Sequence, residues 1–176
     1  EDLYHALFGP RFTDELARRG WTVDDPETRY GIRSREWIHR VGTPLADGAP
    51  DVAALSITAA ERALEDAGIS GSSIDVVLAA TSTPARITSS LAARVGAALE
   101  CSGACLDLRA GGTGGLAAWI TATRMLGGGA RRALVVAAKA SSFYLGVDEP
   151  AIAAVYGDGA GALILQLDPG CESGLV

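Results

Sequence analysis

The chain has 176 residues, of which 48% are hydrophobic and 20% charged, and it carries a formal net charge of -6 at pH 7. This balance is typical of a globular chain with one core and excludes an intrinsically disordered one. The acidic charge argues against nucleic acid as the main partner.

Residues 1–19 are polar and charged, and no apolar run approaches the roughly 20 uncharged residues of a membrane-spanning helix. We therefore expect neither a leader peptide nor a membrane span. The three cysteines, Cys101, Cys105 and Cys171, have neither zinc-site nor thioredoxin spacing. Free thiols, no metal and a reducing, cytoplasmic location are therefore expected.

Residues 1–50 are charged and show no clean hydrophobic period, so we interpret them as a cap or lid on a scaffold of residues 51–176. In that scaffold helical and strand patterns alternate, which predicts right-handed crossovers and a mostly parallel sheet of the α/β class. Gly68 is expected to stop the first helix, and Thr88 or Ser89 to cap the second. The patterns predict helices over 53–67, 89–99 and 116–126, strands over 74–81, 104–108 and 133–138, and a hairpin of 152–156 with 160–167.

The predicted helix 116–126 is apolar on every side. Between residues 110 and 130 the only charged residue is Arg124, and a helix that is apolar all round is buried all round. A single sheet covers one face of such a helix. Because no second set of strands remains to cover the other, we expect another polypeptide, or a missing half of this one, to do so.

The turn between strand 104–108 and this helix has the geometry at which many enzymes mount a nucleophile. Small residues link the two elements, and the N–H groups and dipole of a helix start stabilise a thiolate or an oxyanion. The glycine run lacks the G-x-G-x-x-G and Lys-Ser/Thr patterns of nucleotide-binding loops, so we do not interpret it as one.

Four motifs occur in the order and approximate spacing of the β-ketoacyl-ACP synthase III enzymes, which belong to the thiolase superfamily. The resemblance covers about residues 20–176 and implies one βαβαβαββ half of a five-layered αβαβα fold, without the second half and without the first strand. It implies that helix 116–126 lies in the central layer between two sheets. The motifs are Tyr30-Gly31-Ile32-Arg33-Ser34-Arg35, Thr81-Ser82-Thr83-Pro84, Asp107-Leu108-Arg109-Ala110-Gly111-Gly112-Thr113-Gly114 and Tyr156-Gly157-Asp158-Gly159-Ala160-Gly161-Ala162.

The resemblance implies acyl transfer from a CoA thioester to an active-site cysteine, followed by decarboxylative condensation with malonyl-ACP. The cysteine position falls on Gly112, and the family histidine and asparagine belong to the missing half. The alternative is that Gly112 marks a tight turn where the backbone approaches a neighbouring helix. Thr113 is a weak substitute nucleophile, because neither His5 nor His39 is placed to act as its base, and we interpret it as a helix cap.

The family arginine that contacts the CoA nucleotide corresponds to Arg29. The family tryptophan expected four residues earlier is Asp25 here, and spacing supports neither Trp21 nor Trp37 as a substitute. A local basic cluster would suit CoA phosphates or an acidic carrier protein, or else is a solvated loop. Its members are Arg29, Arg33, Arg35, His39 and Arg40.

The segment around Asp158 is interpreted as structural. Gly157, Gly159 and Gly161 are expected to allow positive φ and close packing, and Asp158 to bond backbone amides.

Three functions are compatible with these residues. The first is a synthase III-like subunit in fatty acid or polyketide-type biosynthesis that lacks its own nucleophile and is completed by a partner chain carrying the second half. The second is an active acyltransferase in which Gly112 is an engineered or bypassed cysteine position. The third is a non-catalytic module that binds CoA or a carrier protein. We expect acyl-CoA or acyl-ACP as substrate, no cofactor, and a hetero-oligomer.

Overall fold

A computed structural model describes residues 9–41, 46–145, 150–168 and 170 of the chain. These residues form two compact units. The described parts of Glu1–Asp51 and Lys139–Gly159 make up unit 1, and those of Val52–Ala138 and Ala160–Val176 make up unit 2. The division between residues 1–50 and 51–176 remains a prediction. No helix in the described part of the chain is long and apolar enough to cross a membrane.

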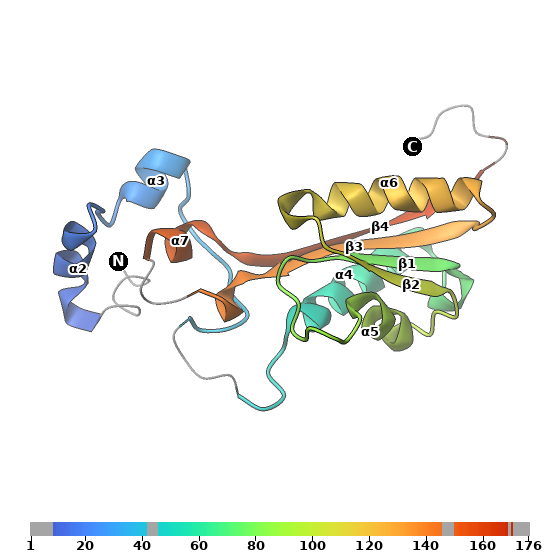
Figure 1. Cartoon of the computed structure of the whole chain (residues 1–176), viewed down its shortest axis with the longest axis horizontal. Coiled ribbons are helices and arrows are strands. Elements are labelled where there is room, and N and C mark those ends of the chain that lie inside the picture. The colour runs from blue at the N-terminus through green and yellow to red at the C-terminus, as the bar shows by residue number, and fades with distance from the viewer. Residues whose placement is uncertain (1–8, 42–45, 146–149, 169, 171–176) are drawn as a thin grey trace. The chain divides into compact units, whose positions relative to one another are not determined.

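The sheet has four strands in the order β2-β1-β3-β4 (Figure 1). β1 pairs in parallel with two neighbours, so that Leu78 stands opposite Leu106 of β2 and Val135 of β3. Leu167, just beyond β4, donates from its backbone N to the Arg131 carbonyl before β3 at 2.9 Å, so β4 runs antiparallel to β3. The predicted α/β class is confirmed. The strands are β1 (Val76–Ala80), β2 (Ala104–Leu108), β3 (Arg132–Ala140) and β4 (Asp158–Gln166).

Helices cover both faces of this sheet (Figure 1). α6 (Gly114–Gly127) lies over one face, and α4 (Val52–Ala67) and α5 (Leu91–Ala98) lie over the other. β1 is consequently buried along its whole length. Its residues Val76 and Leu78 belong to the same core cluster as Ala118 of α6. Burying a Val or Leu side chain contributes about 1.5–3 kcal/mol, so this cluster holds α6 on the sheet.

The ends of two helices test the capping predictions. α4 ends at Ala67, and Gly68 has a φ of +63°, as predicted for a glycine stop. The predicted cap of α5 is wrong by one or two residues, because Ser90 is the cap and its Oγ accepts a hydrogen bond from Ala93 N at 3.0 Å. The extended backbone of Ser90, with φ -68° and ψ 128°, presents the side chain to the open helix end.

The predicted hairpin is also wrong, because residues 152–156 do not form its first strand. They lie largely within α7 (Pro150–Val155), and β4 pairs with β3 instead. Proline is favoured at the first turn of a helix, where its missing N–H has no partner to lose. The alanines that follow favour helix over strand, so the short apolar run was ambiguous.

Unit 1 consists of short helices around a small core. Buried Leu16 of α2 (Phe12–Arg18) and Ala154 of α7 form one cluster of this core, and Trp21 and Val23 pack against them. The third helix, α3 (Asp25–Tyr30), contacts α7. Single 3₁₀ turns in the described chain are η1 (Gly9–Arg11), η2 (Gly71–Ser73), η3 (Gly111–Thr113) and η4 (Ser141–Phe143).

Candidate active site

The strand-to-helix turn predicted from the sequence is present, with β2 leading through η3 into α6. Gly112 is the middle residue of η3, and a Cβ built on it meets no described atom within 4 Å. Its φ lies outside the left-handed region, unlike that of Gly111 at +56°. The interpretation of Gly112 as a close-approach glycine is therefore wrong, and the position has room for a side chain.

The backbone approaches neighbouring strands closely at Gly114 and Gly115 instead. A Cβ on Gly114 would lie 3.3 Å from Ala80 Cβ, and one on Gly115 would lie 3.0 Å from Ala137 Cβ. These contacts bring the first turn of α6 against β1 and β3. The sheet therefore fixes the helix start, while the preceding turn at Gly112 stays open.

Thr113 occupies the N-cap position of α6, as expected. Its backbone has φ -95° and ψ 3°, and its hydroxyl makes no cap hydrogen bond to the helix. Instead Oγ1 donates to the Ala110 carbonyl at 2.8 Å. The backbone N–H groups of Thr113 and Gly114 are also used within the 3₁₀ turn, by the Ala110 and Gly111 carbonyls. Both groups are therefore already partnered at this helix start.

The carboxylate of Asp107 organises the region beside this turn, a role that the sequence did not reveal. It lies on β2 and accepts hydrogen bonds from Leu91 N at 2.9 Å, Ala92 N at 2.7 Å and Ser90 Oγ at 3.0 Å. A carboxylate at a helix N-terminus satisfies N–H groups that have no partner in the helix. Asp107 thus ties β2 to α5 at the edge of the sheet.

The described thiols do not supply a nucleophile at this turn. Burial raises the pKa of Cys101 and of Cys105, with a further rise in Cys105 from the nearby Asp107 charge. A thiol with a raised pKa is largely protonated at neutral pH and reacts slowly. Cys105 packs against α5, where its Sγ would lie 2.9 Å from a Cβ on Gly96. Cys171 lies outside the described residues.

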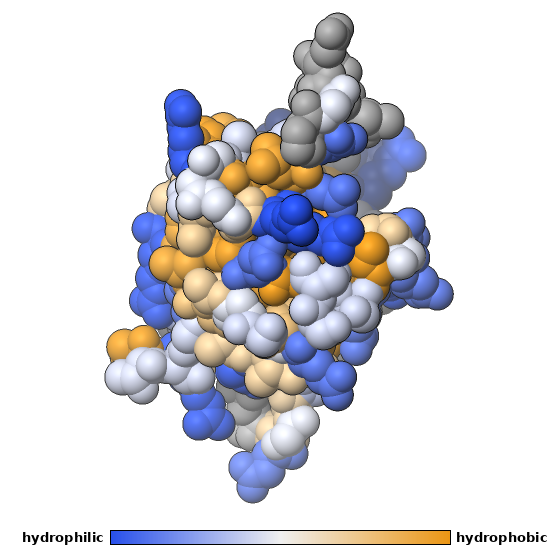
Figure 2. All heavy atoms as spheres, turned by 90° about the vertical axis from the view of Figure 1, so that its right-hand side faces the viewer, coloured by the Kyte–Doolittle hydropathy of each residue, from blue (hydrophilic) through white to orange (hydrophobic). Residues whose placement is uncertain are grey.

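One face of α6 is apolar and exposed. Leu116 and Ile120 expose 59% and 55% of their surface, whereas Ala118 and Ala122 face the core. Within the described chain the sheet therefore covers one face of α6 only, as expected where no second set of strands is present. With Trp119, Thr123 and Arg124, the exposed pair lines a pocket of about 430 Å³. Figure 2 shows apolar and charged residues interspersed on the side of the chain where α6 ends.

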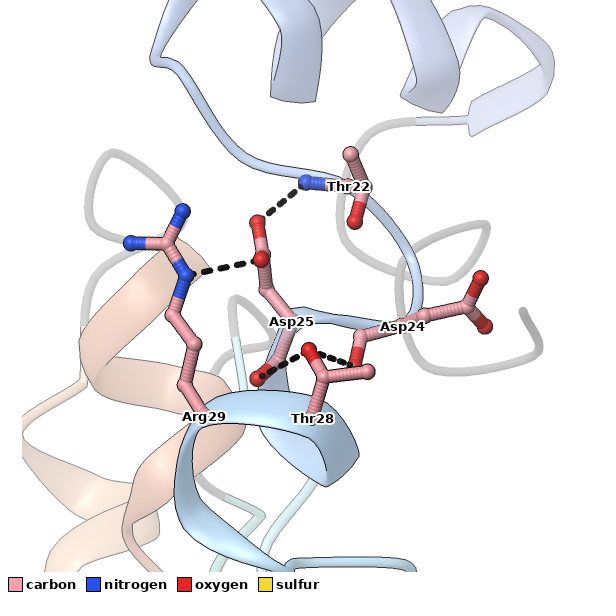
Figure 3. A network of polar contacts seen from close by, with 5 residues as sticks. All are labelled: Thr22, Asp24, Asp25, Thr28 and Arg29. Atoms are coloured by element: carbon pink, nitrogen blue, oxygen red, sulfur yellow. Dashed lines mark hydrogen bonds and ion pairs between the residues drawn. The ribbon is translucent and has the colours of Figure 1, made fainter.

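Arg29 in unit 1 contacts two side chains, Asp25, which Figure 3 shows, and Trp21. Its Nε donates to Asp25 Oδ1 at 2.7 Å, and its guanidinium carbon lies 5.3 Å from the centre of the Trp21 ring. Asp25 Oδ2 also accepts from Thr22 N at 2.6 Å, and this bond, followed by the contact with Arg29, lowers the pKa of Asp25. The ring of Trp21 in turn stacks on that of Tyr30, with 6.3 Å between the ring centres. Trp21 is therefore next to Arg29 despite its unfavourable spacing.

The predicted basic cluster is divided among separate partners. Arg33 Nε donates to Glu27 Oε1 at 2.8 Å in a pair that is largely exposed, which corresponds to the solvated-loop interpretation. The ring of His39 stacks on Phe143 at 5.1 Å, and Trp37 Nε1 donates to the Tyr156 carbonyl at 2.9 Å.

Asp158 bonds backbone amides as predicted. It accepts from Ser142 N at 2.9 Å and from Ile38 N at 3.0 Å, and also from the Ser142 hydroxyl. Gly157 packs closely, since a Cβ there would lie 3.3 Å from Arg35 Cδ. The expected positive φ at Gly157, Gly159 and Gly161 is wrong, and a Cβ on the last two would meet no described atom within 4 Å.

A family model described as 3-Oxoacyl-[acyl-carrier-protein (ACP)] synthase III matches residues 106–175. The β-ketoacyl-[acyl-carrier-protein] synthase III of Rubrobacter xylanophilus is 38% identical over 151 residues, which are 85% of this chain and 45% of that protein. That of Erythrobacter litoralis is 36% identical over 160 residues, 89% of this chain and 47% of that protein. The chain is a relative of the β-ketoacyl-[acyl-carrier-protein] synthase III family.

Solved structures of synthase III relatives have the same fold. A 3-oxoacyl-(acyl carrier protein) synthase III from Pseudomonas aeruginosa matches with a TM-score of 0.75 and 29% identity, over 92% of this chain and 49% of that one. The priming β-ketosynthase from the R1128 polyketide biosynthetic pathway matches with a TM-score of 0.71 and 31% identity, over 86% of this chain and 44% of that one. The predicted thiolase-like fold is therefore confirmed, and the chain spans about half the length of its synthase III relatives.

Proposed function

We propose that this chain is one half of a synthase III-like condensing or acyl-transfer unit, and that a second polypeptide segment covers α6 and completes the site. The observation that carries the proposal is the apolar outer face of α6, where Leu116 and Ile120 are more than half exposed beside the open turn at Gly112. A pair of exposed aliphatic side chains lining a pocket is characteristic of an interaction surface. The half-length match to synthase III relatives supports the same proposal.

In this proposal the chain contributes surface rather than a nucleophile. Condensation by way of an acyl-enzyme needs a group such as a thiolate that attacks the thioester carbon and is later displaced. Gly112 has no side chain to carry an acyl group, and the described cysteines have raised pKa values. The covering segment would therefore bring the reacting groups, and α6 would form one wall of the thioester channel.

The substrate is proposed to be an acyl-CoA or acyl-ACP thioester, and no further cofactor is invoked. Arg29 is the proposed contact for a nucleotide phosphate, with two guanidinium nitrogens beyond the Nε that Asp25 holds. Trp21 offers a neighbouring aromatic surface. The Asp25 charge offsets part of the attraction of Arg29 for phosphate, which favours a modest affinity for CoA.

A second candidate is favoured by the open space at position 112. Because a Cβ fits there without collision, a cysteine at this position is sterically allowed, and the glycine is then an engineered or bypassed position in an active acyltransferase. Incubation with a labelled acyl-CoA and intact-mass analysis separates the candidates, since an acyl adduct on this chain contradicts the scaffold role.

The main proposal is tested by co-expressing the chain with a second-half synthase III polypeptide from the same genome. We expect a stable one-to-one complex that is lost in Leu116→Asp and Ile120→Asp. Ile87→Asp is the matched control, because Ile87 is 88% exposed and lies outside α6. A complex that survives both α6 substitutions would contradict the proposed surface.

A further inference from the structure

Arg35 in unit 1 lines a pocket of about 340 Å³ between α3, the segment after that helix, and α7. The lining includes the apolar side chains of Val23, Ile32, Trp37 and Ala154. Arg29 is not among the residues that line it. The pocket is therefore distinct from the Arg29 surface, and a ligand bound in it is independent of the proposed function.

The hydrogen bonds of the Arg35 guanidinium are incomplete. Nη1 donates to the Ser34 carbonyl at 2.7 Å. Nε and Nη2 are buried and have no hydrogen-bond partner among the described residues. These two nitrogens form one edge of the planar group, and their N–H bonds point the same way at the spacing of two carboxylate oxygens. Buried donors without acceptors are rare and costly, so a side-chain movement that brings this edge to an acceptor in the pocket is favourable.

The charges around the pocket select the kind of acceptor. Arg33 and Glu27 neutralise each other through their 2.8 Å ion pair, and Asp24 adds one negative charge to the lining. Burial lowers the pKa of Arg35, but an arginine still keeps its charge at neutral pH. One positive charge beside one carboxylate favours a singly charged anion over a phosphate dianion.

We propose that this pocket binds a small monocarboxylate with an apolar body. Its two oxygens accept hydrogen bonds from Nε and Nη2 of Arg35, and its alkyl group lies against Val23, Ile32 and Ala154. Both nitrogens are covered in the unliganded chain, so binding requires the Arg35 side chain to move toward the pocket. The indole of Trp37 lines the same pocket and reports the event.

The test is a titration of the full chain with acetate, butyrate and hexanoate at constant ionic strength. The Arg35 Nε–H and Trp37 indole N–H resonances are followed by ¹⁵N NMR. Both signals are expected to shift, with an affinity gain of about three- to fourfold for each added methylene group. Hexanamide, which has the same length without the charge, is expected to bind at least about tenfold more weakly because it cannot pair with a cation.

Substitution supplies the second arm of the test. Arg35→Met should abolish hexanoate binding, whereas Arg62→Met, which alters an exposed arginine of α4 outside the pocket lining, should leave the affinity within about twofold. The proposal would be overturned if the Arg35 resonances do not move at ~50 mM hexanoate, a concentration at which even weak binding is detected. It would also be overturned if hexanamide or inorganic phosphate binds as tightly as hexanoate. If Arg35→Met does not fold, the comparison of hexanoate with hexanamide on the unaltered chain decides the question.

Discussion

The carboxylate of Asp107 accepts a hydrogen bond from Ala92 N at 2.7 Å, which joins the edge strand β2 to the first turn of α5. The same carboxylate accepts from Leu91 N and from Ser90 Oγ. Asp107→Ala should lower the free energy of unfolding by about 1–2 kcal/mol, the usual effect of losing a helix cap. Asp107→Asn should cost less, because the amide oxygen still accepts one bond. Urea unfolding followed by circular dichroism measures both, and equal losses would contradict the capping role.

Substitution by cysteine should leave the stability of the chain nearly unchanged at Gly112 and lower it at Gly115. Gly112→Cys places its Cβ in open space, so the free energy of unfolding should change by less than about 0.5 kcal/mol. Gly115→Cys sets its Cβ only 3.0 Å from Ala137 Cβ, and overpacking of this kind costs about 1–3 kcal/mol. Thermal unfolding of the two variants gives the comparison. A similar loss in both would show that the turn is not open.

Cys101 and Cys105 should alkylate slowly at neutral pH. Burial raises the pKa of both thiols, so at a given pH less of each is the reactive thiolate than in an ordinary exposed cysteine. The rate of iodoacetamide labelling, resolved by peptide mass analysis, should rise steeply between pH 8 and pH 10 (about one decade per pH unit while the thiol is mainly protonated). The chain unfolded in urea provides the reference rate. Rapid labelling of either cysteine in the folded chain at pH 7 would contradict this account.

Asp75 should make unfolding sensitive to acid. Hydrogen bonds from the backbone N–H groups of Arg132, at 2.9 Å, and Arg131, at 2.7 Å, hold its pKa below the ordinary value. Its contribution to stability is therefore complete above the unfolded-state pKa of about 4 and is lost as pH falls through the lower folded-state pKa.

Asp75→Asn should make the free energy of unfolding less dependent on pH below about 4, where the unaltered carboxylate takes up its proton. The matched control is Asp66→Asn, which alters an exposed carboxylate on α4. Urea titrations at several pH values provide the measurement. The same pH slope in Asp75→Asn and in the unaltered chain would show that the bonds from β3 do not stabilise the charged form.

The elements that the sequence predicts well are those with a long, regular pattern. α4 has four turns with apolar residues at helical spacing and ends at Gly68, so its position follows from local physics. The run from Ile152 to Tyr156 is too short to separate helix from strand, and Pro150 outside it decides the outcome. For an apolar run this short, the residues on either side of it decide between helix and strand.

The contacts within the candidate sites were less accessible from the sequence. Trp21 lies against Arg29 because the Asp25 carboxylate accepts a hydrogen bond from Thr22 N, which turns the preceding chain back over α3. Such a turn cannot be predicted from the spacing of residues along a helix. The apolar composition of α6 correctly indicated more than one apolar face. The number of predicted strands also indicated that this chain covers only one face of the helix, and the structure shows that this face carries Ala118 and Ala122.

The most direct test of the central claim is sedimentation velocity on the chain alone, over a range of concentrations. If the outer face of α6 needs a cover, the unaltered chain should self-associate or precipitate, and Leu116→Asp with Ile120→Asp should make it monomeric. The exposed fractions of 59% and 55% for these two side chains are the basis of that expectation. A folded chain that stays monomeric at about 100 μM, well above the Kd of ordinary specific interfaces, would contradict the claim.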